Sequence, residues 1–387
     1  MAQPKLTILF SGMIAGDPWQ GGATWAVLQY VLGLRRLGHD VVIVEPVKDK
    51  SLRPAGAELG HTEQARYFRD VVREFGLERA GCLLRKGTRQ TVGLRYDEVA
   101  EVARRADVLF NVSGMLADEA LLGPIPRRVY LDLDPAFVQL WHAAEGIDMR
   151  FAAHTHFVTV GMNIGLGDCP VPTCGIAWLT TPQPVVLEQW PAAGPVQRDT
   201  WTTVGNWRGY GSVEYRGVHY GQKAHSLRQF MDLPTRTGES FELALAIHPE
   251  EKADLAALAH NRWRLVDPLE AAGMPARYRQ FVRGSKGEFG IAKSGYAVSN
   301  CGWFSDRSAC YIASGRPVIA QETGWGRWLP AGEGVFAFTT TGDVLAALDA
   351  VRRDYAGHSR AARALAERHF DSDVVLGSLL QRVGATA

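Results

Sequence analysis

A run of four polar residues, Ser305 to Ser308, interrupts an otherwise apolar part of the chain and combines two hydroxyls, an acid and a base. An apolar strand is expected before this run, over residues 287–294. Ser305 is a typical helix cap, followed by Asp306 and Arg307 in the first turn and Ser308 beyond them. The N–H groups at such a helix start, together with the Arg307 guanidinium, have the chemistry to bind a diphosphate. Asp306 would repel that anion if it pointed the same way, and a purely structural cap is the alternative.

Polar residues also follow two other expected strands. Asn206 ends the strand 200–206, Arg208 comes just after it, and Lys223 stands immediately before a helix. Cations that converge at such a position suit a phosphate, although a single lysine or arginine is more often a solvated surface charge. The residues that follow the strand 316–321 are Glu322, Thr323 and Gly324. They offer a carboxylate and backbone N–H groups to sugar hydroxyls, or they form an ordinary surface loop.

Three aspartates are candidates for a catalytic base, because an acid at the end of a strand can accept a proton from a substrate hydroxyl. Asp132 and Asp134 close the expected strand 127–135, and alternation puts them on one side if the strand continues that far. Asp134 would alternatively cap the helix that begins at Pro135. The third candidate, Asp17, lies in the glycine-rich loop 12–22.

The same loop ends in Gly21 and Gly22, which precede an expected helix. Glycines let backbone N–H groups approach an anion, and the helix start adds a favourable dipole. The loop does not have the GxGxxG spacing of dinucleotide sites, and it lacks the lysine of a P-loop. A tight turn that needs positive φ is the alternative interpretation.

These candidates must be positioned by two series of strands and helices. The first 46 residues follow the order strand, glycine loop, helix and strand, which predicts a parallel α/β sheet. Residues 168–196 are rich in proline and are expected to form an ordered connector, after which a second strand series begins. We expect an N-terminal Rossmann-like domain over 1–190 and a C-terminal one over 191–365. A terminal helix over 366–387 is expected to cross back to the first domain.

Composition narrows the function classes. The 387 residues carry a formal net charge of +1, which argues against a protein that coats nucleic acid generally. Five cysteines without a CxxC pair fit a reducing compartment. Since no apolar run is long enough to span a membrane, we expect a cytoplasmic protein without stable membrane insertion. No histidine and cysteine spacing matches a known zinc pattern, so no metal site is expected.

Three segments together resemble GT-B glycosyltransferases of the superfamily called group 1, or family 4-like. The segment QGGATWAVLQYVLGLRRLGHDVVIVEP is similar to their glycine-loop start, and GWFSDRSACYIASGRPVIAQETG is similar to their EGFGxxxxEAMASGxPVVASxxGG block. The pieces VGNWRG and YGQK resemble their VGR…KG element, which holds the donor diphosphate. The resemblance implies two Rossmann-like domains that face each other across a cleft. Two glutamates of the family block are replaced, by Gly302 and Cys310, and the arginine of VGR is replaced by Asn206.

The resemblance implies a hexosyltransferase that takes a nucleoside diphosphate sugar as co-substrate, with neither a metal nor a cofactor. Lys223, Arg208 and the helix start at 305–308 would neutralise the departing diphosphate, and Asp134 or Asp132, or else Asp17, would be the base if the reaction inverts. The acceptor, whether small molecule, glycan or nucleic acid, stays open, and a homodimer is possible. The alternatives are a DNA- or nucleoside-modifying transferase, a nucleotide-sugar epimerase on the same fold, and a catalytically silent nucleotide-sugar-binding module.

Overall fold

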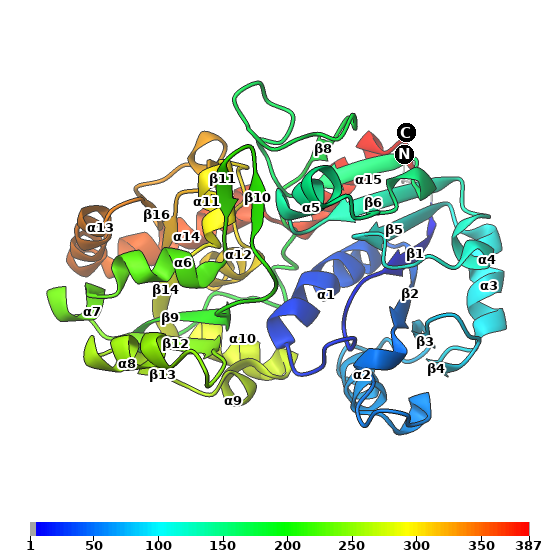
Figure 1. The fold of residues 1–387 in the computed structure, drawn as a ribbon, viewed down its shortest axis with the longest axis horizontal. Helices are drawn as coiled ribbons and strands as arrows, with labels where there is room; N and C mark the ends of the chain where they lie inside the picture. Colours follow the sequence, from blue (N-terminus) through cyan, green and yellow to red (C-terminus); the bar gives the residue numbers. More distant parts are fainter. Residues whose placement is uncertain (1–4, 387) are drawn as a thin grey trace.

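The computed structural model describes residues 5–386, which form two α/β domains joined by a connector (Figure 1). The N-terminal sheet has the strand order β4-β3-β2-β1-β5-β6-β7-β8, and only the β3–β4 pair is antiparallel. Its strands are β1 (Thr7–Ser11), β2 (Asp40–Val47), β3 (Gly81–Arg85), β4 (Thr91–Gly93), β5 (Val108–Val112), β6 (Arg127–Asp132), β7 (His156–Thr159) and β8 (Leu179–Thr180). Its helices are α1 (Gly21–Arg36), α2 (Glu63–Glu74), α3 (Tyr96–Arg105), α4 (Glu119–Leu122) and α5 (Phe137–Glu145).

The C-terminal sheet is entirely parallel, with the strand order β13-β12-β9-β14-β15-β16. Its strands are β9 (Arg198–Asn206), β12 (Phe241–Ala246), β13 (Arg264–Leu265), β14 (Ser285–Gly290), β15 (Val318–Gln321) and β16 (Val335–Phe338), and a separate hairpin contains β10 (Val213–Tyr215) and β11 (Val218–Tyr220). Its helices are α6 (Lys223–Leu227), α7 (Leu233–Arg236), α8 (Lys252–His260), α9 (Pro268–Ala272), α10 (Pro275–Gly284), α11 (Ser294–Ser299), α12 (Asp306–Ala313), α13 (Thr341–Arg353) and α14 (Tyr355–His369).

The last helix, α15 (Ser372–Arg382), lies against α1 of the N-terminal domain (Figure 1). A Cβ atom at Gly33 of α1 would come within 2.5 Å of Leu376 Cδ1, so a glycine is needed for this close approach. The Arg36 guanidinium donates to both oxygens of Asp373 at 2.9 Å and ties the two helices together at their exposed edge.

Helix α1 also packs on the C-terminal domain, and one continuous apolar core therefore extends across the domain boundary. Trp25 of α1 is fully buried beside Trp190 of the connector, and its indole N–H donates to the carbonyl of Pro275 at 2.9 Å. Burial of one such side chain contributes about 1.5–3 kcal/mol. The domains are consequently in direct contact along α1 and α10.

Two expectations about local structure need correction. Residues 168–196 are not only a connector, because Leu179–Thr180 pair with β7 as the edge strand β8 of the first sheet. Asp134 does not cap a helix that starts at Pro135: β6 ends at Asp132 and α5 begins at Phe137, with Ala136 at the cap position. The reason is Ala136 itself, whose φ of 70° breaks the chain direction between strand and helix.

Candidate functional site

The carboxyl ends of β9, β14 and β15 meet at the edge of the C-terminal sheet that faces the N-terminal domain. In parallel α/β sheets, ligands bind at this edge. A cavity of about 10 Å³ lies there, which is room for about one water molecule. We call it the strand-end pocket. The residues that line it include Ala292, Trp303, Ser305, Arg307, Ser308 and Gln321.

The expected helix cap at Ser305 is present. Its Oγ accepts a hydrogen bond from the Arg307 backbone N–H at 3.2 Å, and α12 runs from Asp306 to Ala313. Asp306 forms no ion pair with Arg307 in this structure, and burial raises its pKa. Asp306 and Arg307 therefore do not stabilise each other through an ion pair.

Arg307 instead pairs with Glu288 of β14. Its Nε donates to the Glu288 carboxylate, and its Nη1 donates to the Val204 carbonyl at 2.9 Å. Glu288 is fully buried, and its Oε2 has no hydrogen-bond partner among residues 5–386. Burial and the Glu288 charge act in opposite directions on the Arg307 pKa, which ends above its usual value. Sequence reasoning missed Glu288, because it lies inside a strand and not at its end.

Lys223, the first residue of α6, is buried beside Arg307. A Cβ atom at Gly205, the penultimate residue of β9, would lie 3.4 Å from Lys223 Cε and 3.9 Å from Arg307 Nη1. The Lys223 ammonium donates to the Ile291 carbonyl at 2.5 Å and forms no ion pair among the described residues. Burial, and to a lesser degree the neighbouring guanidinium, lower its pKa well below the usual range. Two cationic side chains thus converge at the end of β9, and the lysine has no anion of its own.

Asp134 belongs to a second cluster that joins the two domains, which we call the bridging cluster. Its carboxylate accepts hydrogen bonds from Tyr210 at 2.5 Å, from Lys293 at 3.1 Å and from the Tyr296 hydroxyl. The Lys293 ammonium lies 4.1 Å from the ring centre of Tyr210, close enough for a cation–π interaction. The Tyr296 ring lies 4.3 Å from that of Trp303, a residue of the strand-end pocket, and is tilted by 34° against it. The bridging cluster is therefore one aromatic ring away from that pocket.

The buried acids Asp132 and Glu45 hold loops in place. Asp132 accepts from Gln139 and Thr159 at 2.8 Å and from the Asp134 backbone N–H at 2.9 Å, so it supports the turn that presents Asp134. Burial raises its pKa to about 6. Glu45 accepts from the backbone of the glycine loop at 2.6 Å, and burial raises its pKa to about 7. Asp132 is 0% exposed, so it acts on the site through Asp134.

The remaining residues of the glycine loop face other surfaces. Asp17 pairs with Arg53 at 2.8 Å and accepts from Gln20. A Cβ atom at Gly21 would lie 2.6 Å from the carbonyl of Met274, and one at Gly22 would lie 2.9 Å from the Tyr278 ring. Both glycines allow α1 to approach the C-terminal domain, and this role differs from the expected anion contact, which stays a prediction.

Most of the polar residues predicted at the other strand ends form contacts with nearby residues of the C-terminal domain. Asn206 is exposed, and Arg208 pairs with Glu251 at the surface. The Glu322 carboxylate accepts from the Gly324 backbone N–H at 2.6 Å. Gly324 and Thr323 are buried, and Thr323 donates to the Trp303 carbonyl at 2.5 Å. These contacts orient the wall of the strand-end pocket next to Trp303.

Asn163 of the N-terminal domain was not anticipated by the sequence. It donates to the carbonyls of Asn300 at 2.9 Å and Gly324 at 3.0 Å, both in the C-terminal domain. Nothing in its local sequence signals this contact. Lys293, by contrast, lies near the end of the predicted strand 287–294, and this position is the signal that could have revealed the bridging cluster.

Within residues 5–386, no set of three or more His, Cys, Asp or Glu side chains is arranged to hold a metal ion. No helix in this part of the chain is both long and apolar enough to cross a membrane.

Protein-family models and curated protein sequences give no match to the chain. Solved structures match over almost its full length. An alpha-glucosyltransferase in complex with UDP and a 13-mer DNA has a TM-score of 0.61 at 13% sequence identity, covering 97% of this chain and 99% of that one. HepE of Anabaena in complex with UDP-glucose has a TM-score of 0.60 at 13% identity, covering 98% and 100%. The predicted fold is thereby confirmed as GT-B, the two-domain architecture of nucleotide-sugar glycosyltransferases.

Proposed function

We propose that this protein is a glycosyltransferase that moves a hexose from a nucleoside diphosphate sugar to an acceptor hydroxyl. The observation that carries the proposal is the convergence of Lys223, Arg307 and the start of α12 at the strand ends of the C-terminal domain. An uncompensated buried ammonium and a helix start are suited to a diphosphate. The structural neighbours were solved with UDP or UDP-glucose, so UDP-glucose is the first donor to test.

In this reaction the bond between the anomeric carbon and the phosphate oxygen breaks, and a bond to the acceptor oxygen forms. Negative charge builds up on the departing diphosphate, and preorganised cations that face this charge lower the barrier. Lys223, Arg307 and the α12 dipole supply positive charge at that place. We therefore infer that turnover does not require a divalent metal and persists in a chelator.

The strand-end pocket must widen before a nucleotide sugar can enter, because it has room for about one water molecule. Asp134 belongs to the N-terminal domain and Lys293 to the C-terminal domain, and their contact holds the domains together near the strand-end pocket. Opening of the domains would separate the two residues. Asp134 would then face the bound donor and accept the proton of the acceptor hydroxyl. We infer that opening and closing of the domains accompany each turnover.

Incubation with a panel of nucleotide sugars tests the proposal. Release of nucleoside diphosphate, first from UDP-glucose, is expected, because water can replace the acceptor slowly. Small-molecule, glycan and DNA acceptors are then compared for stimulation of this release. Conversion of the sugar without nucleotide release would favour an epimerase instead. No release, and no thermal shift with any nucleotide, would leave the transferase assignment without support.

Replacement of Asp134 by asparagine is expected to lower kcat by about 10²–10⁴-fold, since a general base contributes about that much. The KM for the donor should change little, because Asp134 lies on the acceptor side. The measurement is steady-state kinetics with the best donor and acceptor.

A matched control is Asp168→Asn, which removes the exposed ion pair to Arg327, more than 150 residues away in sequence and outside the bridging cluster. Exposed ion pairs contribute about 0–1 kcal/mol, so this variant should keep its kcat. If both variants keep kcat, Asp134 is a structural bridge and another group accepts the proton.

A further inference from the structure

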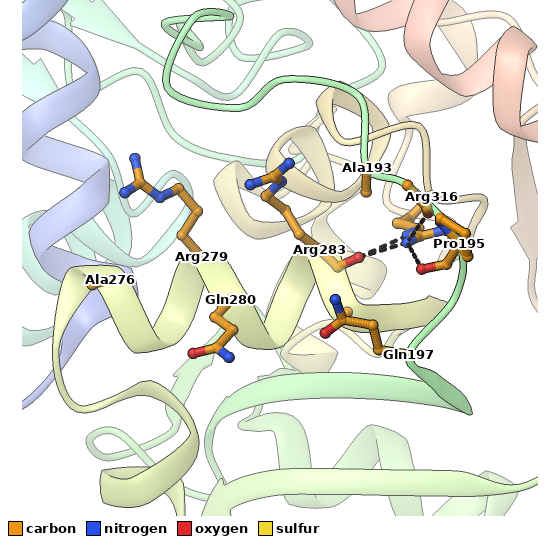
Figure 2. Close-up of a pocket in the computed structure, with 10 residues that line it drawn as sticks. Ala193, Pro195, Gln197, Ala276, Arg279, Gln280, Arg283 and Arg316 are labelled. Carbon is orange, nitrogen blue, oxygen red and sulfur yellow. Dashed lines mark hydrogen bonds between the residues drawn. The ribbon is translucent and has the colours of Figure 1, made fainter.

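A second pocket, of about 300 Å³, lies between α10 and the connector, outside the strand-end pocket (Figure 2). Gly194 and Pro195 of the connector line one side, together with Gln197, which follows the connector. Arg279 and Arg283 of α10 also line it, and Arg316 lies next to Pro195. A volume of this size is at the lower limit of small-molecule sites. We call it the connector pocket.

The connector pocket is strongly cationic. Three arginines line it and no aspartate or glutamate does, and none of these arginines forms an ion pair among residues 5–386. Glu74 is close enough for its charge to interact with Arg279, but the two form no ion pair among the described residues. Guanidinium groups that lack a carboxylate partner attract anions, because an arginine stays charged at every physiological pH.

Two of the arginines already have neutral partners that fix their positions. Arg316 is 2% exposed and donates to the carbonyls of Arg283 and Gly194 and to the Tyr355 hydroxyl. Arg279 donates to the Gln189 side chain at 2.8 Å. Carbonyl and amide oxygens satisfy the N–H groups but leave the positive charge uncompensated.

Arg283 differs from both. Its side chain has no hydrogen-bond partner in the described part of the chain, although its Nε has lost contact with solvent. Arg279 and Arg283 are four residues apart and rise from the same side of α10, as Figure 2 shows. A buried donor without a partner destabilises the fold, and a bound anion would remove that penalty.

We propose that the connector pocket binds the phosphate group of a small phosphorylated molecule, with Arg283 as the principal ligand and Arg279 beside it. A planar guanidinium matches the oxygens of a phosphate in a two-pronged contact. The Gln197 amide also lines the pocket and can bind a hydroxyl of an attached group. This site is separate from the strand-end pocket and does not depend on the proposed transferase activity.

Occupancy would also stabilise the domain arrangement. The connector leads from the N-terminal domain into β9, and α10 packs on α1. A phosphate held between connector and α10 adds a contact at this junction, and a ligand that binds only the folded arrangement raises its stability.

The test is calorimetric titration of the full-length protein with inorganic phosphate and with glucose 1-phosphate, at constant ionic strength in a chloride buffer. All variants carry Lys223→Ala, which weakens phosphate binding at the strand-end pocket. In this background binding is expected to persist. Arg283→Ala should weaken it by about 10-fold or more, the loss expected for a charge-assisted hydrogen bond. The fold should be kept, because Arg283 has no side-chain partner to lose.

Arg277→Ala is the matched control, because Arg277 is an exposed arginine of the same helix. It should leave the affinity within about 2-fold, since Arg277 is exposed to solvent, which screens its charge, and does not line the pocket. Tighter binding of glucose 1-phosphate than of phosphate would indicate a phosphate monoester as the ligand, and equal binding would indicate free phosphate. Absence of binding at millimolar phosphate, or equal weakening by Arg277→Ala and Arg283→Ala, would overturn the proposal.

Discussion

Replacement of Lys223 by alanine is expected to lower kcat for donor cleavage by about 10²–10³-fold, the loss that follows removal of one preorganised donor to a developing negative charge. Lys223 is buried, the Ile291 carbonyl is the only hydrogen-bond partner of its ammonium within residues 5–386, and Arg307 lies close by. A positive charge in this place has no function in stability, since burial disfavours it. We propose that an anion that arrives with the substrate stabilises the charged form.

The properties of the same lysine predict that nucleotide binding is coupled to proton uptake. In the empty site its pKa lies well below the usual range, because burial and the neighbouring Arg307 disfavour the charged form. A bound diphosphate reverses this effect and raises the pKa, so nucleotide binding takes up a proton. The affinity for UDP is therefore expected to fall as pH rises from the pKa of the free site toward that of the complex. Calorimetry of UDP binding in buffers of different ionisation enthalpy measures the uptake.

Lys223→Ala should abolish the proton uptake as well as the catalysis, while the unfolding midpoint is maintained or raised. The control is Lys252→Ala, since Lys252 is exposed and pairs with Glu250 at the surface. Full activity of Lys223→Ala, or the same buffer dependence with and without the lysine, would refute its assignment to the donor diphosphate.

Replacement of Arg307 by methionine is expected to lower the free energy of unfolding by about 3–5 kcal/mol, because it leaves the Glu288 carboxylate buried without its cation. Glu288 is fully buried, and one of its oxygens already lacks a partner in the described chain. The measurement is denaturant unfolding at neutral pH. Donor binding should weaken in the same variant.

The double variant Arg307→Met with Glu288→Met separates the two effects. Two well-packed apolar side chains often replace a buried ion pair without loss, so we expect the double variant to be more stable than Arg307→Met alone. UDP affinity should nevertheless stay low, because the cation is still missing. Restored affinity in the double variant would mean that Arg307 serves only the fold. A single variant as stable as the wild type would contradict the buried-pair argument.

Local sequence signals were sufficient for the elements around the site. The helix predicted to start after Ser305 is α12, and the helix predicted after the glycine loop is α1. Capping and hydrophobic periodicity act over a few residues, so a single sequence displays them. The GT-B fold, which the resemblance implies, is confirmed. It could be predicted because the order of strands and helices along the sequence determines most of this fold.

The structure changed the interpretation of the acidic candidates. The sequence alone offers Asp132 and Asp134 equally as candidates for the catalytic base. In the structure, Asp132 is 0% exposed beneath the turn, whereas Asp134 joins the two domains. Cys310, at the position of a family glutamate, is buried in the core next to Gln29 of α1, so this position does not line the strand-end pocket. Nothing within a few residues of these positions indicates such differences.

The sequence by itself therefore determined the two parallel α/β domains, the polar strand ends and the helix start at Ser305. Only the tertiary structure decided that Arg307 pairs with Glu288 and not with the adjacent Asp306, and that Asp134 meets Lys293 from 159 residues away. The reason is physical: the state of a charged group depends on its burial and on its partners within a few ångströms. Those partners are set by the packing of distant strands and of the two domains, which no local pattern records.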